Sequence, residues 1–293
     1  MTGGSPGWEP HTVVTGEYLD PGPVAALAAL FDDGLDAPRA GDPLPPLWHW
    51  VALARWAPST QLGIDGHPFR GSFLPPVDLP RRMFAGGVVM FHGELRVGDD
   101  VRRAATVESV TEKTGRSGKL VIVVTSTTLF AADGSLAVVE KQNLIYREAA
   151  AARTGEPAPP EPPPAMVPAG SPFVVAGDGA WDFRTDPTLL MRFSAATANA
   201  HRIHYDWPYA TGVEGYPGLV VHGPLMTLAL AEAYRLGGDA RPVAALSHRN
   251  SAPLFCGNAA RMRTSSTDEG VRVELAGPDD GSAAHTTVDL RLR

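Results

Sequence analysis

The chain begins with a polar stretch, residues 1–16, that we expect to be loose. Apolar residues at helical spacing follow it. Asp20 is a capping residue, and the run PVAALAALFDDG that follows begins with a first-turn proline and ends at Gly34. This pattern predicts a short amphipathic helix whose role is packing. The strongly apolar segment Leu47–Leu53 predicts a second, buried helix. The stretch Gly63–Pro80 carries turn dipeptides and is expected to be irregular.

From Gly87 the pattern changes to Val-, Thr- and Ile-rich runs separated by glycine-containing turns, which is typical of strands. The four predicted strands are Val88–Leu95, Val101–Glu112, Lys119–Phe130 and Leu136–Arg147. We expect them to form an antiparallel meander. Helices ahead of such a meander predict an α+β layer in which the sheet wraps a helix.

The second half repeats this order of helices followed by strands. Thr185-Asp186-Pro187 starts a helix that runs to about Ala196, Asp206 can cap a short turn, and Val221–Leu236 forms a long helix stopped by Gly237-Gly238. The predicted strands are Val243–Ala252, Ala259–Ser266, Val271–Ala276 and His285–Leu292.

A short internal similarity supports two copies of one fold. The segment ELRVGD (94–99), followed by VRRAAT, resembles PLFCGN (253–258), followed by AARMRTS. Residues 149–172 are rich in Pro, Ala and Glu, and they have too little apolar surface to fold, so they predict a spacer between domains. The expected domains are therefore residues 1–148 and 173–293, with a linker over 149–172.

Composition narrows the class of protein. Apolar residues make up 44% of the 293-residue chain, the net charge is −7, and no block of Lys and Arg occurs. These features disfavour partners such as nucleic acid or an anionic membrane. The single cysteine, Cys256, excludes an internal disulfide and reads as a small core residue. Residues 1–20 lack an apolar core, and no apolar run could span a bilayer, so a cytoplasmic location is expected.

A dense polar cluster follows the helix that ends near Ala196. It holds Asn199, His201, His204 and Asp206. Histidine titrates near neutral pH, so His204 is the candidate acid or base, and His201 is either a second such group or a hydrogen-bond support for it. Asn199 cannot act as a base, but its amide can orient water or a carbonyl. A metal site built from the two histidines and Asp206 is a less favoured alternative.

The glycine of His222-Gly223-Pro224 is expected to open the long helix. The start of a helix presents free N–H groups and a partial positive charge, so Gly223 is a candidate to stabilise an oxyanion. His222 either caps and packs or contacts the ligand. The other expected substrate-binding residues are Arg202, Tyr205 and Arg249, and the pair Arg81-Arg82 could also meet phosphate or carboxylate groups.

These motifs carry a resemblance to a known family. The stretch FSAATANAHRIHYDWPYA, followed by YPGLVVHGPLMTLAL, resembles the catalytic region of hot-dog-fold, MaoC-like enoyl-thioester hydratases and dehydratases. It is most similar to the hydroxyacyl-thioester dehydratase type 2 branch and to the mesaconyl-C4-CoA hydratases. The first half, from LPPLWHW through FLPPVDLPRRMFAGG to VEKQNLIYRE, resembles the N-terminal domain of those double-hot-dog proteins. The resemblance implies a tandem hot-dog fold, with a sheet wrapped around a helix in each half.

The resemblance also implies a function. In R-specific enoyl-CoA hydratases an Asp and a His flank the reacting water, and an N–H at a helix start holds the thioester oxygen. His204 and Gly223 match two of these positions, whereas Asn199 stands where the Asp is expected. We therefore expect His204 to handle the proton while Asn199 positions water or substrate, at one active site per chain located at the junction of the halves.

The predicted activity is that of a hydro-lyase acting at the 2,3-double bond of a short acyl thioester, with mesaconyl-C4-CoA or a 3-hydroxyacyl-CoA as candidates. No metal or other cofactor is expected beyond the CoA or carrier-protein phosphopantetheine of the substrate, and the chain could form a homodimer. Conjugate addition of another nucleophile or thioester hydrolysis on a carrier-bound substrate is the second interpretation. A non-catalytic acyl-thioester binding subunit is the third.

Overall fold

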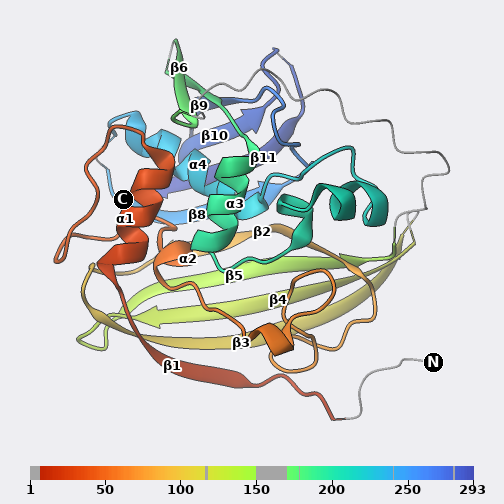
Figure 1. The fold of residues 1–293 in the computed structure, drawn as a ribbon. Helices are drawn as coiled ribbons and strands as arrows, with labels where there is room; N and C mark the ends of the chain where they lie inside the picture. The colour runs from red at the N-terminus through yellow and green to blue at the C-terminus, as the bar shows by residue number, and fades with distance from the viewer. Residues whose placement is uncertain (1–6, 116–117, 150–169, 178, 240, 280) are drawn as a thin grey trace.

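One antiparallel sheet organises the protein. The structure, a computed structural model, describes residues 7–115, 118–149, 170–177, 179–239, 241–279 and 281–293. Within these ranges eleven strands lie in the order β1-β3-β4-β5-β2-β8-β11-β10-β9-β7-β6 (Figure 1). The strands are β1 Thr12–Tyr18, β2 Arg81–Phe91, β3 Asp100–Gly115, β4 Gly118–Phe130, β5 Leu136–Arg147, β6 Phe173–Gly177, β7 Ala180–Phe183, β8 Val243–Asn250, β9 Arg261–Thr267, β10 Gly270–Ala276 and β11 Ala284–Leu292.

The sheet consists of two similar halves that meet at β2 and β8. The order β3-β4-β5-β2 in the first half is mirrored by β9-β10-β11-β8 in the second. The internal similarity predicted from sequence is confirmed, because both segments form a bridge and then a turn: Arg96 pairs with Pro43, and Phe255 pairs with Val220. Gly98 and Gly257, which follow those bridges, have positive φ angles of 93° and 84°.

The predicted four-stranded meander is wrong at one strand. Strands β3, β4 and β5 are consecutive neighbours, but β2 pairs with β5 and β8 instead of β3. The connection after β2 makes no tight hairpin, because Leu95 and Val97 are buried in the core. The strand also begins at Arg81, earlier than the predicted Val88, and it ends at Phe91.

Three short strands were not predicted. The lead-in expected over residues 1–16 forms β1 from Thr12 onward, which pairs along β3, and β6 and β7 form a hairpin ahead of the second half. Each of the three has at most seven residues, and the sides of β1 alternate only between exposed and half-buried. Such short edge strands carry too weak a hydrophobic alternation to be read from sequence.

The predicted helix ends are confirmed by their caps. In α1 (Pro21–Phe31) the Asp20 carboxylate accepts from the Gly22 N–H at 2.6 Å, and in α3 (Pro187–Ala196) Asp186 accepts from the Leu189 N–H at 2.9 Å. The α1 helix ends at Asp32 in a left-handed conformation, two residues before the predicted Gly34. The long helix α4 spans Gly223–Leu236: it ends at the predicted residue and opens at Gly223 as the Gly-Pro pair indicated, two residues after the predicted Val221.

Helix α4 is the centre of the second half. All its residues from Leu225 to Tyr234 are buried, and it packs against β10 and β11. Its counterpart in the first half, α2 (His49–Ala52), is only four residues long. The indole N–H of Trp48 donates to the buried Glu232 carboxylate on α4 at 3.1 Å, so the two halves also share a polar contact inside the core.

The predicted linker lies mostly outside the described residues, at 150–169, and its domain boundaries stay a prediction. The two halves contact each other where β2 pairs with β8, as Figure 1 shows. Among the described residues, no helix has both the length and the apolar character needed to cross a membrane.

Candidate active site

A cavity of about 610 Å³ lies between the two halves. Its size is within the usual range for sites that bind small molecules. The first half contributes apolar and charged side chains to the wall, among them Trp50, Leu53, His67, Arg81, Arg82, Phe84, Arg103 and Leu144. The second half contributes Asn199, His201, His204, Val220, Gly223, Pro224 and Asn250. Three of the predicted catalytic side chains and the predicted helix start therefore face one space.

His204 presents an unprotonated ring nitrogen. It lies in the short 3-10 helix η2 (Arg202–His204), and its Nδ1 lies 2.6 Å from the carbonyl oxygen of Val220. A carbonyl only accepts, so Nδ1 carries the hydrogen and Nε2 keeps its lone pair. Burial lowers the pKa of His204 well below 6.5, and the neighbouring His222 and His201 lower it further. His204 is therefore neutral near pH 7 and can accept a proton.

Asn199 and His201 are tied to their surroundings. The Asn199 Oδ1 accepts from the backbone N–H of His201 at 3.1 Å, which leaves the amide nitrogen as its free donor. The residue before it, Ala198, has a positive φ of 51°, so the chain turns sharply into the cluster. His201 is buried, and its Nε2 lies 3.8 Å from Glu214, which also accepts from Arg81 at 3.2 Å.

The start of α4 presents two kinds of N–H donor to the cavity. Gly223 is the first helical residue, so its N–H has no partner within the helix, and Pro224 has no N–H. Asn250, on β8, accepts from the Thr286 hydroxyl at 2.8 Å through Oδ1, and its buried Nδ2 has no hydrogen-bond partner in the described part of the chain. A Cβ placed on Gly223 would lie only 3.4 Å from that Nδ2 and 3.2 Å from Phe84, so the glycine allows this close approach.

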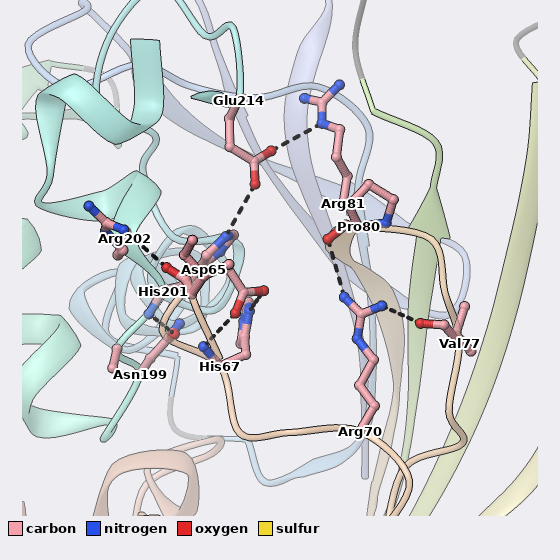
Figure 2. A network of polar contacts seen from close by, with 12 residues as sticks. Asp65, His67, Arg70, Val77, Pro80, Arg81, Asn199, His201, Arg202 and Glu214 are labelled. Carbon is pink, nitrogen blue, oxygen red and sulfur yellow. Dashed lines mark hydrogen bonds and ion pairs between the residues drawn. The ribbon is translucent and has the colours of Figure 1, made fainter. Parts of the chain in front are cut away.

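Two polar residues of the irregular stretch before β2 were not singled out as site residues from the sequence. The Asp65 carboxylate accepts from the His67 N–H and from its ring Nδ1, both at 3.0 Å (Figure 2). Burial acts to raise the pKa of Asp65, but the bonds and charge of His67 lower it to about 2, so Asp65 is ionised. The His67 ring lies 4.2 Å from the His201 ring, measured between centroids. The Asp-Gly-His spacing in a turn is the one sequence signal that points to this pair.

Arg82 differs from two other arginines of the wall, Arg81 and Arg103. Arg81 pairs with Glu214, and Arg103 pairs with Glu17 at 3.0 Å. Arg82 has neither a hydrogen-bond partner nor an ion-pair partner in the part of the chain that the structure describes. Burial lowers its pKa, and the nearby Arg70 acts in the same direction, whereas Tyr146 and the Asp65 carboxylate raise it. A half-buried guanidinium without a hydrogen-bond partner in the described residues indicates an anionic ligand.

Four residues expected to bind substrate do not line this cavity. His222 is fully buried, its ring stacks on His204 at 3.6 Å, and its Nε2 lies 2.8 Å from the Ser194 hydroxyl. Arg202 pairs with Asp206, the exposed Tyr205 donates to a backbone carbonyl, and Arg249 is exposed on β8. Their roles in binding stay predictions.

The alternative metal site from His201, His204 and Asp206 does not assemble. Asp206 pairs with Arg202 at 2.7 Å, while His204 donates to a backbone carbonyl. Possible metal-ligand atoms of Asp65, His67 and His201 lie within 4.8 Å of one another, but Asp65 and His67 already form a hydrogen bond with each other. Burial raises the pKa of the Cys256 thiol to about 12, so it is no activated nucleophile.

Comparison with known proteins agrees with this architecture. The family described as hydroxyacyl-thioester dehydratase type 2 matches residues 47–256. The mesaconyl-C(4)-CoA hydratase of Chloroflexus aurantiacus is 43% identical over 268 residues, which is 90% of each chain. The crystal structure of HtdX of Mycobacterium tuberculosis matches with a TM-score of 0.62 at 20% identity, over 97% of this chain and 100% of that one. A second Mycobacterium tuberculosis protein, described as having a double hotdog fold, matches with a TM-score of 0.53 at 17% identity, over 97% and 94% of the two chains. The predicted double-hot-dog fold is thus confirmed.

The buried histidines predict that acid destabilises the protein. Burial lowers the pKa of His67 and His222 to about 3 and that of His248 to about 4, from 6.5. Below pH 6.5 the unfolded chain takes up protons that the folded chain does not, so each group costs about 1.4 kcal/mol per pH unit. Glu232, with its pKa raised to about 7, acts in the opposite sense but is a single group. We expect a lower free energy of unfolding at pH 5 than at pH 7, measured by urea denaturation. Equal values would contradict neutral buried histidines.

Proposed function

The chain belongs to the hydroxyacyl-thioester dehydratase type 2 family, and from this we propose that it is a hydro-lyase acting at the 2,3-double bond of an acyl thioester. The observation that supports this most directly is the pairing of a proton acceptor with unpaired N–H donors around one cavity. His204 offers the acceptor through Nε2, and Gly223 and Asn250 offer the donors. Hydration of an enoyl thioester needs both, because one group must take a proton from water and others must hold the negative charge that develops.

The proposed reaction proceeds through an enolate. The Nε2 of His204 takes a proton from water while the water oxygen forms a bond to C3, and the π electrons of the double bond move towards the thioester oxygen. The N–H groups of Gly223 and Asn250 hold that oxygen. The proton on His204 is then returned to C2, which restores the neutral ring and the thioester carbonyl. Dehydration is the same sequence in reverse.

The surroundings favour this chemistry. The first half supplies apolar side chains to the wall, from Trp50, Leu53, Phe84 and Leu144, against which the acyl group can pack. Beside these apolar side chains a hydrogen bond to developing charge is stronger than in open water. The neutral state of His204 is also suited to accepting the first proton, since a protonated ring could not do so.

Arg82 supports a substrate that carries a second negative charge. The Chloroflexus relative is named for mesaconyl-C(4)-CoA, whose enoyl thioester bears a methyl group and a carboxylate on C3. We propose that this chain acts on such a substrate and that Arg82 binds the carboxylate. An ion pair of this kind would satisfy the half-buried guanidinium.

We expect His204→Ala to lower the hydration rate by roughly 10²–10⁴, the contribution of a general acid or base. Loss of enoyl absorbance is followed with crotonyl-CoA and mesaconyl-C4-CoA, and free thiol is measured in the same samples. The control is His92→Ala, because His92 is exposed and lies outside the cavity. Wild-type turnover by a folded His204→Ala protein would refute the assignment. Thiol release without hydration would favour a thioesterase, and no turnover on any thioester would favour a binding subunit.

We expect Asn250→Ala to lower kcat by about 10²–10³, the loss seen when one oxyanion donor is removed. Asn250→Asp is the matched variant, because it keeps the shape and the bond to Thr286 but replaces the donor with a negative oxygen. It should lose at least as much activity as the alanine variant. An aspartate variant as active as wild type would show that Asn250 does not hold the oxyanion.

Arg82→Met should lower kcat/KM for mesaconyl-C4-CoA by about 10- to 100-fold, the value of a charge-assisted hydrogen bond. The matched substrate is 3-methylcrotonyl-CoA, which has a methyl group in place of the carboxylate and should lose little activity. Arg82→Lys keeps the charge and should lie between wild type and Arg82→Met. Equal losses on both substrates would mean that Arg82 shapes the wall and does not recognise the carboxylate.

A further inference from the structure

A water molecule that attacks C3 has two hydrogens, and His204 can accept only one of them. At a buried position on the cavity wall the second hydrogen also needs an acceptor, because an unpaired buried donor is costly and the water would be free to rotate. Asn199 also lines the cavity, but one of the two lone pairs of its oxygen accepts from the backbone N–H of His201, which turns this oxygen towards the backbone of its own loop. The nitrogen of its amide can only donate. A ring nitrogen with a free lone pair on the same wall can take this second hydrogen.

His67 has the required free lone pair. Its Nδ1 donates to the ionised Asp65 at 3.0 Å, so its Nε2 carries no hydrogen. No partner of Nε2 occurs among the residues that the structure describes, and His67 lines the same cavity as His204. The His201 ring lies beside both, with its centroid 4.2 Å from that of His67 and 5.5 Å from that of His204.

The turn that carries His67 is fixed against the catalytic loop of the other half. Gly66 has a φ of +89°, and a Cβ on it would lie 1.8 Å from the carbonyl oxygen of Ala200. The carbonyl of Asp65 accepts from the Arg202 N–H at 2.9 Å. Figure 2 shows Asp65 and His67 on the segment that faces Asn199 and His201. The turn of the first half is thus held at a defined place against the loop that leads to His204.

The charges around His67 keep it neutral. Burial, and after it the charge of Arg82, lower its pKa to about 3 against the opposing effect of Asp65. Two further histidines, His201 and His204, share the cavity wall with His67, and His201 also lowers the pKa of His67. A neutral ring that is held at Nδ1 accepts a hydrogen bond at Nε2 in a fixed direction.

We propose that His67 is a second catalytic residue: its Nε2 accepts a hydrogen bond from the reacting water, while His204 takes the proton that leaves. Asp65 is a positioning residue that fixes the tautomer and direction of the ring. This inference rests on the proposed hydration. It differs from a role for His201, whose Nε2 is turned towards Glu214.

The test compares variants with mesaconyl-C4-CoA at one pH. His67→Ala should lower kcat by about 10- to 100-fold, since a buried water hydrogen loses its acceptor, and KM should change by less than about threefold because the thioester contacts remain. Asp65→Asn keeps His67 but can reverse its tautomer, so it should also lose activity. It serves as the test variant if His67→Ala does not fold. His92→Ala is the control.

A double variant separates catalysis from structure. A carboxylate at position 199 can accept the water hydrogen, so Asn199→Asp should restore at least part of the kcat lost in His67→Ala, while the same change in wild type should have a smaller effect. In an Asp65→Asn background it should restore activity in the same way. A purely structural role for His67 predicts no such restoration.

The outcomes are distinguishable. Hydration by wild type with unchanged kcat in a folded His67→Ala protein overturns the role of His67 but not the function. Lost activity that Asn199→Asp does not restore in either background overturns it as well. Absence of hydration by wild type on every enoyl thioester overturns the proposed function itself.

Discussion

The hydrogen-bonded ladder between β2 and β8 is the contact on which the rest of the structure depends. Five residue pairs, from Gly86–Arg249 to Met90–Ala245, join two half-sheets into one. Glycine is required at this seam, because a Cβ on Gly86 would lie 2.3 Å from the His248 carbonyl oxygen. Since the strands are antiparallel, the ladder brings the start of β2, with Arg82, next to the end of β8, with Asn250. One backbone pairing thus assembles both walls of the cavity.

Burial determines the chemistry inside these walls. His204 and His67 are kept neutral by desolvation, and each has its Nδ1 hydrogen committed to an oxygen acceptor. The positive charge of the cavity comes from arginines of the first half. The second half supplies the proton acceptor and N–H donors instead. This division gives an anionic acyl group one preferred orientation, because its charge and its thioester oxygen are attracted to different walls.

Regular spacing made much of the fold predictable. Capping aspartates located the starts of α1 and α3, the Gly-Pro pair and Gly237 located α4, glycine turns located β4 and β5, and the motif around His204 and Gly223 placed both at one cavity. The partners of β2 could not be predicted from local spacing. They depend on how the segment after β2 packs, and its residues Leu95 and Val97 are buried in the core. Asp65 and His67 were missed for a similar reason. The two residues reach the cavity because Gly66 packs against the backbone of Ala200. Gly66 and Ala200 are far apart in sequence, and no local sequence pattern predicts their contact.

The shortness of α2 has a consequence for how the protein can be divided. With only four residues, α2 has no long buried stretch like that of α4. Its start is therefore not comparable to the start of α4 as a place to hold a ligand. The two halves are therefore related by symmetry in their sheets but have become unequal in what they contribute. Expressed separately, the second half would keep its histidine motif yet lose the facing wall. The working unit is the fused pair, and neither copy could be exchanged for a duplicate of the other.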